Sequence, residues 1–487
     1  MSASLNQLSA GELIARLQRG EISNAEIVRA TLDRIEAVEP SIRAFITVRD
    51  RSDLLIEAEA VDQRRRRGES VGPLGGLPVA VKDNINTTSI RTTCASKILE
   101  NYIPTYDATV IRKIKEADGI ILGKTNLDEF AMGSSTENSA FQVTRNPHNL
   151  DYVAGGSSGG SAGAVAAHET ILAIGSDTGG SVRLPASYCG VVGLKPSYGR
   201  VSRYGLVAFG SSLDQIGPLA RTVDDAELLF SAIAGHDPCD STSVPDHVAS
   251  GYIDPLGPLR IGVPKEYFVE GVAPEVRAAC RRVLEVLKQS GHESIPISLP
   301  HTEYAVSAYY IIACAEASAN LERYDGVRYG LRAADYTSFT DMLRKTRTAG
   351  FGSEVRRRIM LGTYVLSSGY YDAYYIRASK VRTLIRRDFD EAFTRCDFLL
   401  TPVAPTPAFK IGEKTADPLM MYLNDIFSVT ANLTGLPAIS IPCGRSEAGL
   451  PLSVQLTGPM FSERLLFNVA RLVEQHSEAD PTSNLRE

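Results

Sequence analysis

Short apolar runs alternate with stretches of helical periodicity from about residue 77 onward, and this alternation constrains the fold more than any other feature. Strands buried on both faces read as continuous apolar runs, whereas helices repeat their apolar residues about every 3.6 positions. The pattern therefore predicts an α/β fold with a mixed, largely buried sheet covered by helices. The expected strands are residues 77–81, 120–122, 171–174, 259–263, 398–400, 438–441 and 452–456, and the expected helices include 108–117 and 274–289.

Two regions depart from this alternation. In residues 1–70, Ser9-x-x-Glu12 and Ser23-x-x-Glu26 fit the capping box, in which two side chains satisfy free amides of a helix's first turn. Residues 304–390 have a helical texture and hold many of the chain's 20 tyrosines. Because no long Pro/Ser linker intervenes, we expect one large domain at 71–487 with a helical, Tyr-rich insertion at about 304–390, and an N-terminal helical segment at 1–70 that packs on it.

Charge and composition exclude several classes of protein. The 487 residues include 51 Lys and Arg and 57 Asp and Glu, and the net charge of -6 argues against a protein that coats nucleic acid. The seven Cys form no C-x-x-C motif and the seven His are scattered, which favours reduced thiols over disulfides or a metal centre. The N-terminus does not read as a secretory signal, and the longest uncharged run, 426–444, is interrupted by Pro437 and Pro442. We therefore expect a cytoplasmic protein with no membrane span and no metal site.

A Gly/Ser-rich segment at residues 155–163 reads Gly-Gly-Ser-Ser-Gly-Gly-Ser-Ala-Gly and leads into helix-forming residues. A glycine-rich loop that enters a helix exposes backbone N–H groups that can bind anions. The segment has neither the Lys-Ser/Thr ending of a Walker motif nor the G-x-G-x-x-G pattern of dinucleotide sites. Taken alone, it fits a tight turn with close helix packing as well as it fits an anion site.

A second glycine pair stands directly before a serine in residues 176–185, Ser-Asp-Thr-Gly-Gly-Ser-Val-Arg-Leu-Pro. The backbone amides of Thr178, Gly179, Gly180 and Ser181 could form an oxyanion hole, because glycine lets a reacting carbonyl approach the main chain closely. Ser181 is then the candidate nucleophile. A serine nucleophile needs a base, yet no His lies in either segment and the G-x-S-x-G elbow is absent around Ser181.

Lys82 is the candidate base. It ends the apolar run Val-Ala-Val-Lys, and burial at the end of such a strand lowers the pKa of a lysine so that part of it is neutral. The alternative is a structural ion pair between Lys82 and either Asp83 or Asp177. The sequence alone leaves both interpretations open.

Together, Lys82, the 155–161 loop and the 177–185 segment resemble the amidase signature family, and their separations along the chain are similar to those in that family. The resemblance implies a single α/β/α domain and a Ser–Ser–Lys triad. It assigns Ser181 as the acyl-forming nucleophile, Ser157 as the bridging serine on a cis peptide bond, and Lys82 as the base. It also implies hydrolysis of an amide through an acyl-enzyme, without a metal or organic cofactor in this chain.

Three further segments resemble a subgroup of this family, the glutamine-hydrolysing subunits of tRNA-dependent amidotransferases: 316–329, 357–363 and 366–375. The resemblance implies a heterotrimer with the B and C subunits of such an enzyme and glutamine as the amide. It also implies that the B subunit uses ATP and Mg²⁺ and holds Glu-tRNA(Gln), which is converted to Gln-tRNA(Gln). Whether Asp-tRNA(Asn) is a second substrate is not decided by this sequence.

The same resemblance suggests how glutamine is held. Arg358 is placed on the α-carboxylate and Asp425 on the α-ammonium, which agrees with the chemistry of a zwitterion. Tyr309 or Tyr310 lines the pocket. The simpler interpretations are that Arg358 belongs to a solvated run of arginines at 356–358 and that Asp425 caps a helix, and the register of Arg357 against Arg358 stays open.

Three other functions compete with this hypothesis. A stand-alone amidase of the same family would act on a small amide without tRNA. A non-catalytic scaffold is disfavoured because all three triad positions are filled. A nucleotide-binding module on the 155–163 loop is disfavoured because the loop lacks the lysine and acidic partners of such sites.

Overall fold

The computed structural model describes residues 4–477, and its centre is an 11-stranded sheet within that range. The order across the sheet is β1 (Phe45–Val48), β3 (Ile120–Thr125), β2 (Pro78–Lys82), β6 (Leu172–Asp177), β8 (Gln215–Ala220), β7 (Val192–Lys195), β12 (Ala438–Arg445), β13 (Pro451–Thr457), β11 (Phe398–Pro402), β9 (Arg260–Pro264) and β10 (Glu293–Ile297). A separate two-stranded sheet pairs β4 (Arg145–Asn146) with β5 (Asn149–Val153).

Strand directions make the sheet mixed, as the sequence predicts. β3, β2 and β6 are parallel to one another, and so are β11, β9 and β10. The strands from β6 through β8, β7, β12 and β13 to β11 pair antiparallel at each step. Each of the seven expected strands is present. The strands β7, β8 and β10 were not expected from the sequence, since glycine or proline interrupts the apolar pattern of each.

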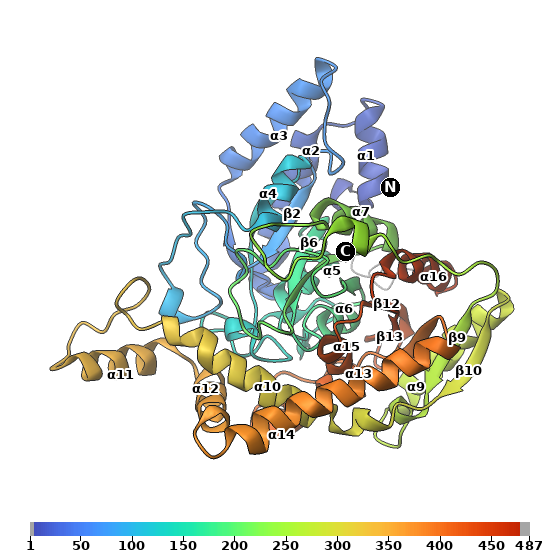
Figure 1. The fold of residues 1–487 in the computed structure, drawn as a ribbon. Helices are drawn as coiled ribbons and strands as arrows, with labels where there is room; N and C mark the ends of the chain where they lie inside the picture. Colours follow the sequence, from blue (N-terminus) through green and yellow to red (C-terminus); the bar gives the residue numbers. More distant parts are fainter. Residues whose placement is uncertain (1–3, 478–487) are drawn as a thin grey trace.

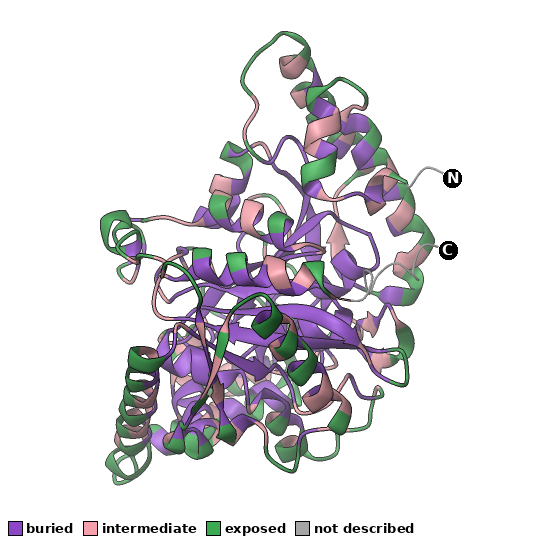
Figure 2. Cartoon of the chain, turned by 90° about the vertical axis from the view of Figure 1, so that its right-hand side faces the viewer, coloured by how far each residue is buried: buried purple, intermediate pink, exposed green. Residues whose placement is uncertain are grey.

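Helices cover the buried sheet on both sides (Figure 2), and most of them are labelled in Figure 1. Their bounds are α1 (Ala10–Gln18), α2 (Asn24–Ile42), α3 (Arg51–Arg66), α4 (Thr109–Glu116), α5 (Gly159–Ala166), α6 (Arg183–Cys189), α7 (Val223–Ile233), α8 (Asp246–Ala249), α9 (Pro274–Gln289), α10 (Ala305–Asn320), α11 (Phe339–Gly350), α12 (Ser353–Leu366), α13 (Arg377–Arg395), α14 (Pro418–Tyr422), α15 (Val429–Thr434) and α16 (Glu463–Gln475). The expected helices at 108–117 and 274–289 are confirmed as α4 and α9.

The N-terminal segment is not purely helical. Its helices α1, α2 and α3 frame the strand β1, which pairs antiparallel with β3 and forms one edge of the central sheet. The full capping box at Ser23 and Glu26 is confirmed, whereas Ser9 accepts the amide of Glu12 without the reciprocal bond. Residues 4–70 are therefore continuous with the large sheet. Sequence periodicity missed β1, in which Thr47 interrupts a short apolar run.

The Tyr-rich insertion is helical, as expected, and consists chiefly of α10, α12 and α13, which run along the bottom of Figure 1, with α11 projecting to the left. A short π-helical turn at Asp372–Ile376 joins α12 to α13. Strand β11 then returns the chain to the sheet. The insertion places Tyr309 of α10 against Gly179, and Arg358 of α12 lies over the ring of Tyr310, so both helices border the candidate site.

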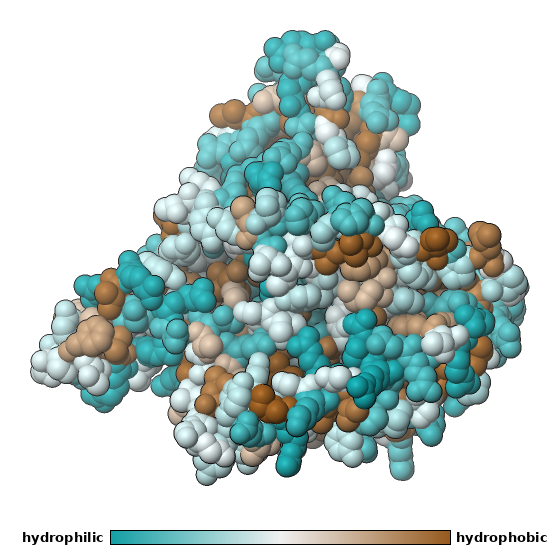
Figure 3. All heavy atoms as spheres, viewed as in Figure 1, coloured by the Kyte–Doolittle hydropathy of each residue, from teal (hydrophilic) through white to brown (hydrophobic). Residues whose placement is uncertain are grey.

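Within residues 4–477, no helix is both long and apolar enough to cross a membrane. The face drawn in Figure 3 is mostly hydrophilic or intermediate, with isolated hydrophobic groups. Cys239 is exposed, and the other six cysteines are buried.

Candidate active site

The three residues predicted to form the triad lie at the carboxyl ends of the interior strands β2 and β6. Lys82 is the last residue of β2, Ser157 lies in the loop before α5, and Ser181 lies between β6 and α6. The Lys82 Nζ donates to Ser157 Oγ at 2.7 Å, and the Gly156–Ser157 peptide bond is cis. Within the described chain, no hydrogen bond joins the Ser157 and Ser181 hydroxyls, but the amide of Ser158 donates to the Ser181 carbonyl at 3.0 Å. The fold thus brings the three predicted residues together.

The environment of Lys82 suits a base rather than an ion pair. Its side chain is fully buried, and burial lowers its pKa from 10.5 to about 7 against the opposing effect of Asp128, Asp177 and Asp214. Neither ion pair considered from the sequence is formed, because Asp83 pairs with Lys124 and Asp177 pairs with Arg183. A lysine with this pKa is partly neutral near neutral pH and can accept a proton.

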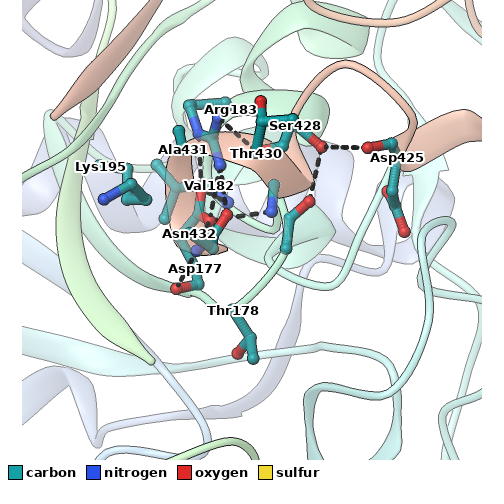
Figure 4. Close-up of polar contacts among 12 residues, drawn as sticks. Asp177, Thr178, Val182, Arg183, Lys195, Asp425, Ser428, Thr430, Ala431 and Asn432 are labelled. Carbon is teal, nitrogen blue, oxygen red and sulfur yellow. Dashed lines mark hydrogen bonds and ion pairs between the residues drawn. The ribbon is translucent and has the colours of Figure 1, made fainter. Parts of the chain in front are cut away.

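The segment that carries Ser181 is fixed by a buried ion pair (Figure 4). The Asp177 carboxylate accepts hydrogen bonds from Nε and Nη2 of Arg183, each at 3.0 Å. It also accepts hydrogen bonds from the amides of Gly180 and Val182. Arg183 in turn reaches the C-terminal part of the chain through Asn432 Oδ1 at 2.7 Å. Burial opposes ionisation of Asp177, but the charge and hydrogen bonds of Arg183 outweigh it and hold the pKa of that carboxyl well below its usual range. The turn around Ser181 is therefore set from both sides.

Replacing Asp177 by asparagine should lower the stability of the protein strongly. It leaves the Arg183 guanidinium buried without its counter-charge, and breaking such a pair costs about 3–5 kcal/mol. We expect a thermal midpoint several degrees lower, measured by circular dichroism. The matched control is Asp33→Asn, which removes one partner of an exposed ion pair with Arg51 and should leave the midpoint nearly unchanged. Equal losses in the two variants would contradict the role given to the buried pair.

The oxyanion hole predicted from Thr178, Gly179 and Gly180 needs one revision. The Gly180 amide donates to Asp177 Oδ1 at 2.9 Å, so it supports the turn. Among the described residues, the amides of Thr178, Gly179 and Ser181 have no hydrogen-bond partner, and the Thr178 hydroxyl donates to Asp214 Oδ1 at 2.6 Å. A Cβ on Gly179 would lie 2.5 Å from the ring of Tyr309, and Gly180 has φ +132, where a Cβ would lie 2.2 Å from Ser428 Oγ. Both positions therefore require glycine.

The residues predicted to bind glutamine surround the same spot. Tyr309 lies against Gly179, and Asp425 accepts Ser134 Oγ at 2.7 Å and Tyr310 Oη at 3.4 Å. Both tyrosines thus border the site. Burial raises the pKa of Asp425 to about 7.

Arg358 is the inward-facing arginine of α12. It is buried, donates to Glu354 Oε1 at 2.8 Å, and its guanidinium carbon lies 5.1 Å from the ring centre of Tyr310. Arg357 is half-exposed and pairs with the other oxygen of Glu354. The structure thus separates two neighbouring arginines that the sequence did not distinguish, and Asp425 contacts side chains instead of only ending a helix.

Several residues of the site carried no signal in the sequence. Ser176 accepts a hydrogen bond from Lys82 on its hydroxyl, and Asn84 donates to the same hydroxyl. Asp128 accepts hydrogen bonds from the amides of Ser135 and Thr136 beside the Ser157 loop. Ser428 donates to the Gly179 carbonyl at 2.5 Å. All of them are polar residues that lie next to a glycine-rich or buried segment. This pattern is too frequent in protein sequences to identify them as site residues.

The loop at 155–163 is not a phosphate cradle. The amide of Ser158 donates to Ser181, that of Gly159 to Thr136 Oγ1, and that of Gly160 to Asn126, so these donors are already used. Every residue from 154 to 163 is buried. The described residues also contain no group of three or more His, Cys, Asp or Glu side chains that could hold a metal ion.

Comparisons with known proteins agree with this geometry. The family model described as Amidase matches residues 26–467. The A subunit of glutamyl-tRNA(Gln) amidotransferase from Carboxydothermus hydrogenoformans is 59% identical over 97% of this chain and 98% of its own length.

Solved structures give the same result. The crystal structure of the A subunit of glutamyl-tRNA(Gln) amidotransferase from Thermotoga maritima superposes with a TM-score of 0.79 at 44% identity, covering 97% of this chain and 95% of its own. A 6-aminohexanoate cyclic dimer hydrolase superposes with a TM-score of 0.81 at 28% identity, covering 97% of each chain. The chain belongs to the amidase family and, within it, to the group of glutamyl-tRNA(Gln) amidotransferase A subunits.

Proposed function

We propose that this chain hydrolyses glutamine to glutamate and ammonia, as the A subunit of an amidotransferase that converts Glu-tRNA(Gln) to Gln-tRNA(Gln). The observation that carries the proposal is the placement of Arg358 and Asp425, a buried cation and a buried carboxyl group, around the nucleophile turn. Free glutamine is a zwitterion, and a pocket for it needs one group of each charge. The high identity to A subunits supports the same substrate.

The proposed reaction uses Lys82, Ser157 and Ser181 as a relay. Neutral Lys82 takes a proton from Ser157, which takes one from Ser181, and the Ser181 oxygen attacks the side-chain amide carbon of glutamine. The amides of Thr178, Gly179 and Ser181 stabilise the oxyanion. The relay returns the proton to the leaving nitrogen, the C–N bond breaks and ammonia departs, leaving a glutamyl ester on Ser181. Water, deprotonated by the same relay, hydrolyses that ester to glutamate.

The proposed partners are the B and C subunits of the amidotransferase. Ammonia would pass to the B subunit, which would hold Glu-tRNA(Gln) and use ATP and Mg²⁺ to activate its γ-carboxylate. No cofactor is assigned to this chain, and the proposed location is the cytoplasm. The negative net charge of -6 supports a division of labour in which most of the tRNA contact belongs to the B subunit.

The experiment that tests the function measures ammonia release from glutamine by the complex purified through this chain, with and without Glu-tRNA and ATP. We expect release that is stimulated when both are present. The second candidate is a stand-alone amidase, which the fold shared with a cyclic dimer hydrolase favours. Release from simple amides by this chain alone, indifferent to tRNA and without preference for glutamine, would support that candidate and contradict the amidotransferase.

Replacing Arg358 by alanine should raise the KM for glutamine by about 100-fold or more, because a charge-assisted bond to the α-carboxylate is lost together with its stacking on Tyr310. Hydrolysis of an uncharged amide should fall much less. The matched control is Arg357→Ala, which removes the half-exposed neighbour on the same helix and should leave the KM nearly unchanged. Equal losses on charged and uncharged amides would show that Arg358 does not bind the carboxylate.

A further inference from the structure

Three oxygen atoms surround the amine of Lys82. Its Nζ lies 2.7 Å from Ser157 Oγ, 2.9 Å from Ser176 Oγ and 3.1 Å from the Ser176 carbonyl oxygen. Lys82 forms no ion pair within residues 4–477. The three N–H groups of the charged amine therefore match three acceptors, two of which belong to one residue outside the triad.

The Ser176 carbonyl oxygen differs from the Ser157 hydroxyl in what it can do. The carbonyl oxygen can only accept, so one N–H of Lys82 must point to it. The Ser176 hydroxyl is held on another side by Asn84 Nδ2, which donates to it at 2.9 Å. When Lys82 loses the proton that faces Ser157, its two remaining N–H groups stay on the Ser176 oxygens. The lone pair then faces the Ser157 hydroxyl, the direction that the relay requires.

We propose that Ser176, held by Asn84, is a positioning residue that directs the lone pair of neutral Lys82 toward Ser157. The inference rests on the amide hydrolysis proposed above and adds a residue to it. The main chain makes this contact possible, because β2 and β6 are parallel neighbours with Val81 opposite Ile174. Lys82, Asn84 and Ser176 are all buried, so water does not compete for these bonds.

The variant that tests the proposal is Ser176→Ala, which removes the hydroxyl and keeps the carbonyl. We expect kcat for ammonia release to fall at least about ten-fold with little change in the KM for glutamine. The ammonium form of Lys82 also loses a hydrogen-bond acceptor, which lowers the pKa of Lys82. The acid limb of the kcat profile, where kcat rises with pH as Lys82 loses its proton, should therefore move down by about one pH unit. Ser176→Thr keeps the hydroxyl and should restore both. Asn84→Ala should give a smaller shift in the same direction.

Other titratable groups near Lys82 are Asp128, Asp177, Asp214 and Cys94, and within the described chain none of them bonds to its amine. They are the same in the variant and the parent, so a difference between the two profiles reports on Ser176. The matched control is Ser440→Ala, a buried serine of β12 whose hydroxyl has no hydrogen-bond partner among residues 4–477. That control should leave kcat and the acid limb unchanged.

A second measurement separates this proposal from the choice of substrate. The rate at which an alkyl sulfonyl fluoride labels Ser181 is followed against pH in the full-length chain, because labelling needs the relay and no glutamine pocket. A downward shift of its acid limb in Ser176→Ala supports the positioning role even where glutamine is not hydrolysed. An unchanged limb in both assays, with the parent protein active, would overturn it and leave the glutaminase function standing.

Discussion

Replacing Ser181 by alanine should lower ammonia release from glutamine by about 10⁴-fold or more, because the acyl-enzyme cannot form without the hydroxyl. The change removes one oxygen from a turn that the Asp177–Arg183 pair and the Gly180 amide hold in place, so the fold should persist. Ammonia is measured directly, and the circular dichroism spectrum and thermal midpoint should match those of the parent. Glutamine should still bind, since Arg358 and Asp425 are untouched.

Mass spectrometry adds a qualitative readout to this loss of rate. The parent protein, quenched with acid during turnover, should carry a glutamyl group on the peptide that contains Ser181, and the variant should carry none. The control is Ser187→Ala, which alters a buried serine of α6 whose hydroxyl makes no hydrogen bond to the described residues. An adduct on Ser157 instead, or undiminished ammonia release in Ser181→Ala, would show that the nucleophile is misassigned.

The serines and the lysine proposed as catalytic could be selected from the sequence because the chemistry proposed for them is indicated by local sequence. Gly179, Gly180 and Ser181 form a continuous motif, and Lys82 stands at the end of an apolar strand whose burial the sequence already indicates. Lys82 and Ser157 are far apart in the chain, and the packing of α5 and its preceding loop against β2 and β6 brings Lys82 Nζ within 2.7 Å of Ser157 Oγ. The resemblance to a known family supplied that pairing, which periodicity alone could not.

The rest of the site depends on which way side chains turn. Arg357 and Arg358 are neighbours in one helix, and only the packing of α12 on α10 decides that Arg358 faces inward. The Gly180 amide looked available for an oxyanion, but Asp177 folds back and accepts it. Ser176 resembles any serine at the end of a strand. Such choices are made by tertiary contacts and leave no periodic trace in the sequence.

The fold shows the same division between local and tertiary information. Strands with a continuous apolar run, such as Val79–Val81 in β2 and Phe398–Leu400 in β11, were expected from the sequence, whereas β8 contains Gly217 and Pro218 and was not expected. In the structure β8 is central and buried, and it pairs with β6 and β7 on its two sides. Its neighbours supply the pairing and burial that its own residues do not indicate.

Replacing Lys82 by methionine should reduce ammonia release by about 10³-fold or more while leaving the fold intact. Methionine matches the length of the lysine stem and suits a fully buried position, whereas it can neither accept a proton nor donate to Ser157. The pH dependence of the rate is a second readout of the role of Lys82. Burial lowers the pKa of Lys82 to about 7, so the parent should gain activity as pH rises through that value and the base loses its proton. Residual activity of the variant should lack this limb.

Lys195 separates the effect of burial from the effect of position. Burial also lowers its pKa to about 7, yet its Nζ donates to the Pro196 carbonyl at 2.8 Å and, in the part of the chain that the structure describes, makes no hydrogen bond to either triad serine. Lys195→Met should therefore leave the acid limb in place, even if the thermal midpoint changes.

Because Asp425 also has a pKa raised to about 7, the limb is best followed by sulfonyl fluoride labelling of Ser181, which bypasses the glutamine pocket. A limb that survives in Lys82→Met and vanishes in Lys195→Met would contradict the relay, since it would assign the proton to the lysine that does not contact Ser157.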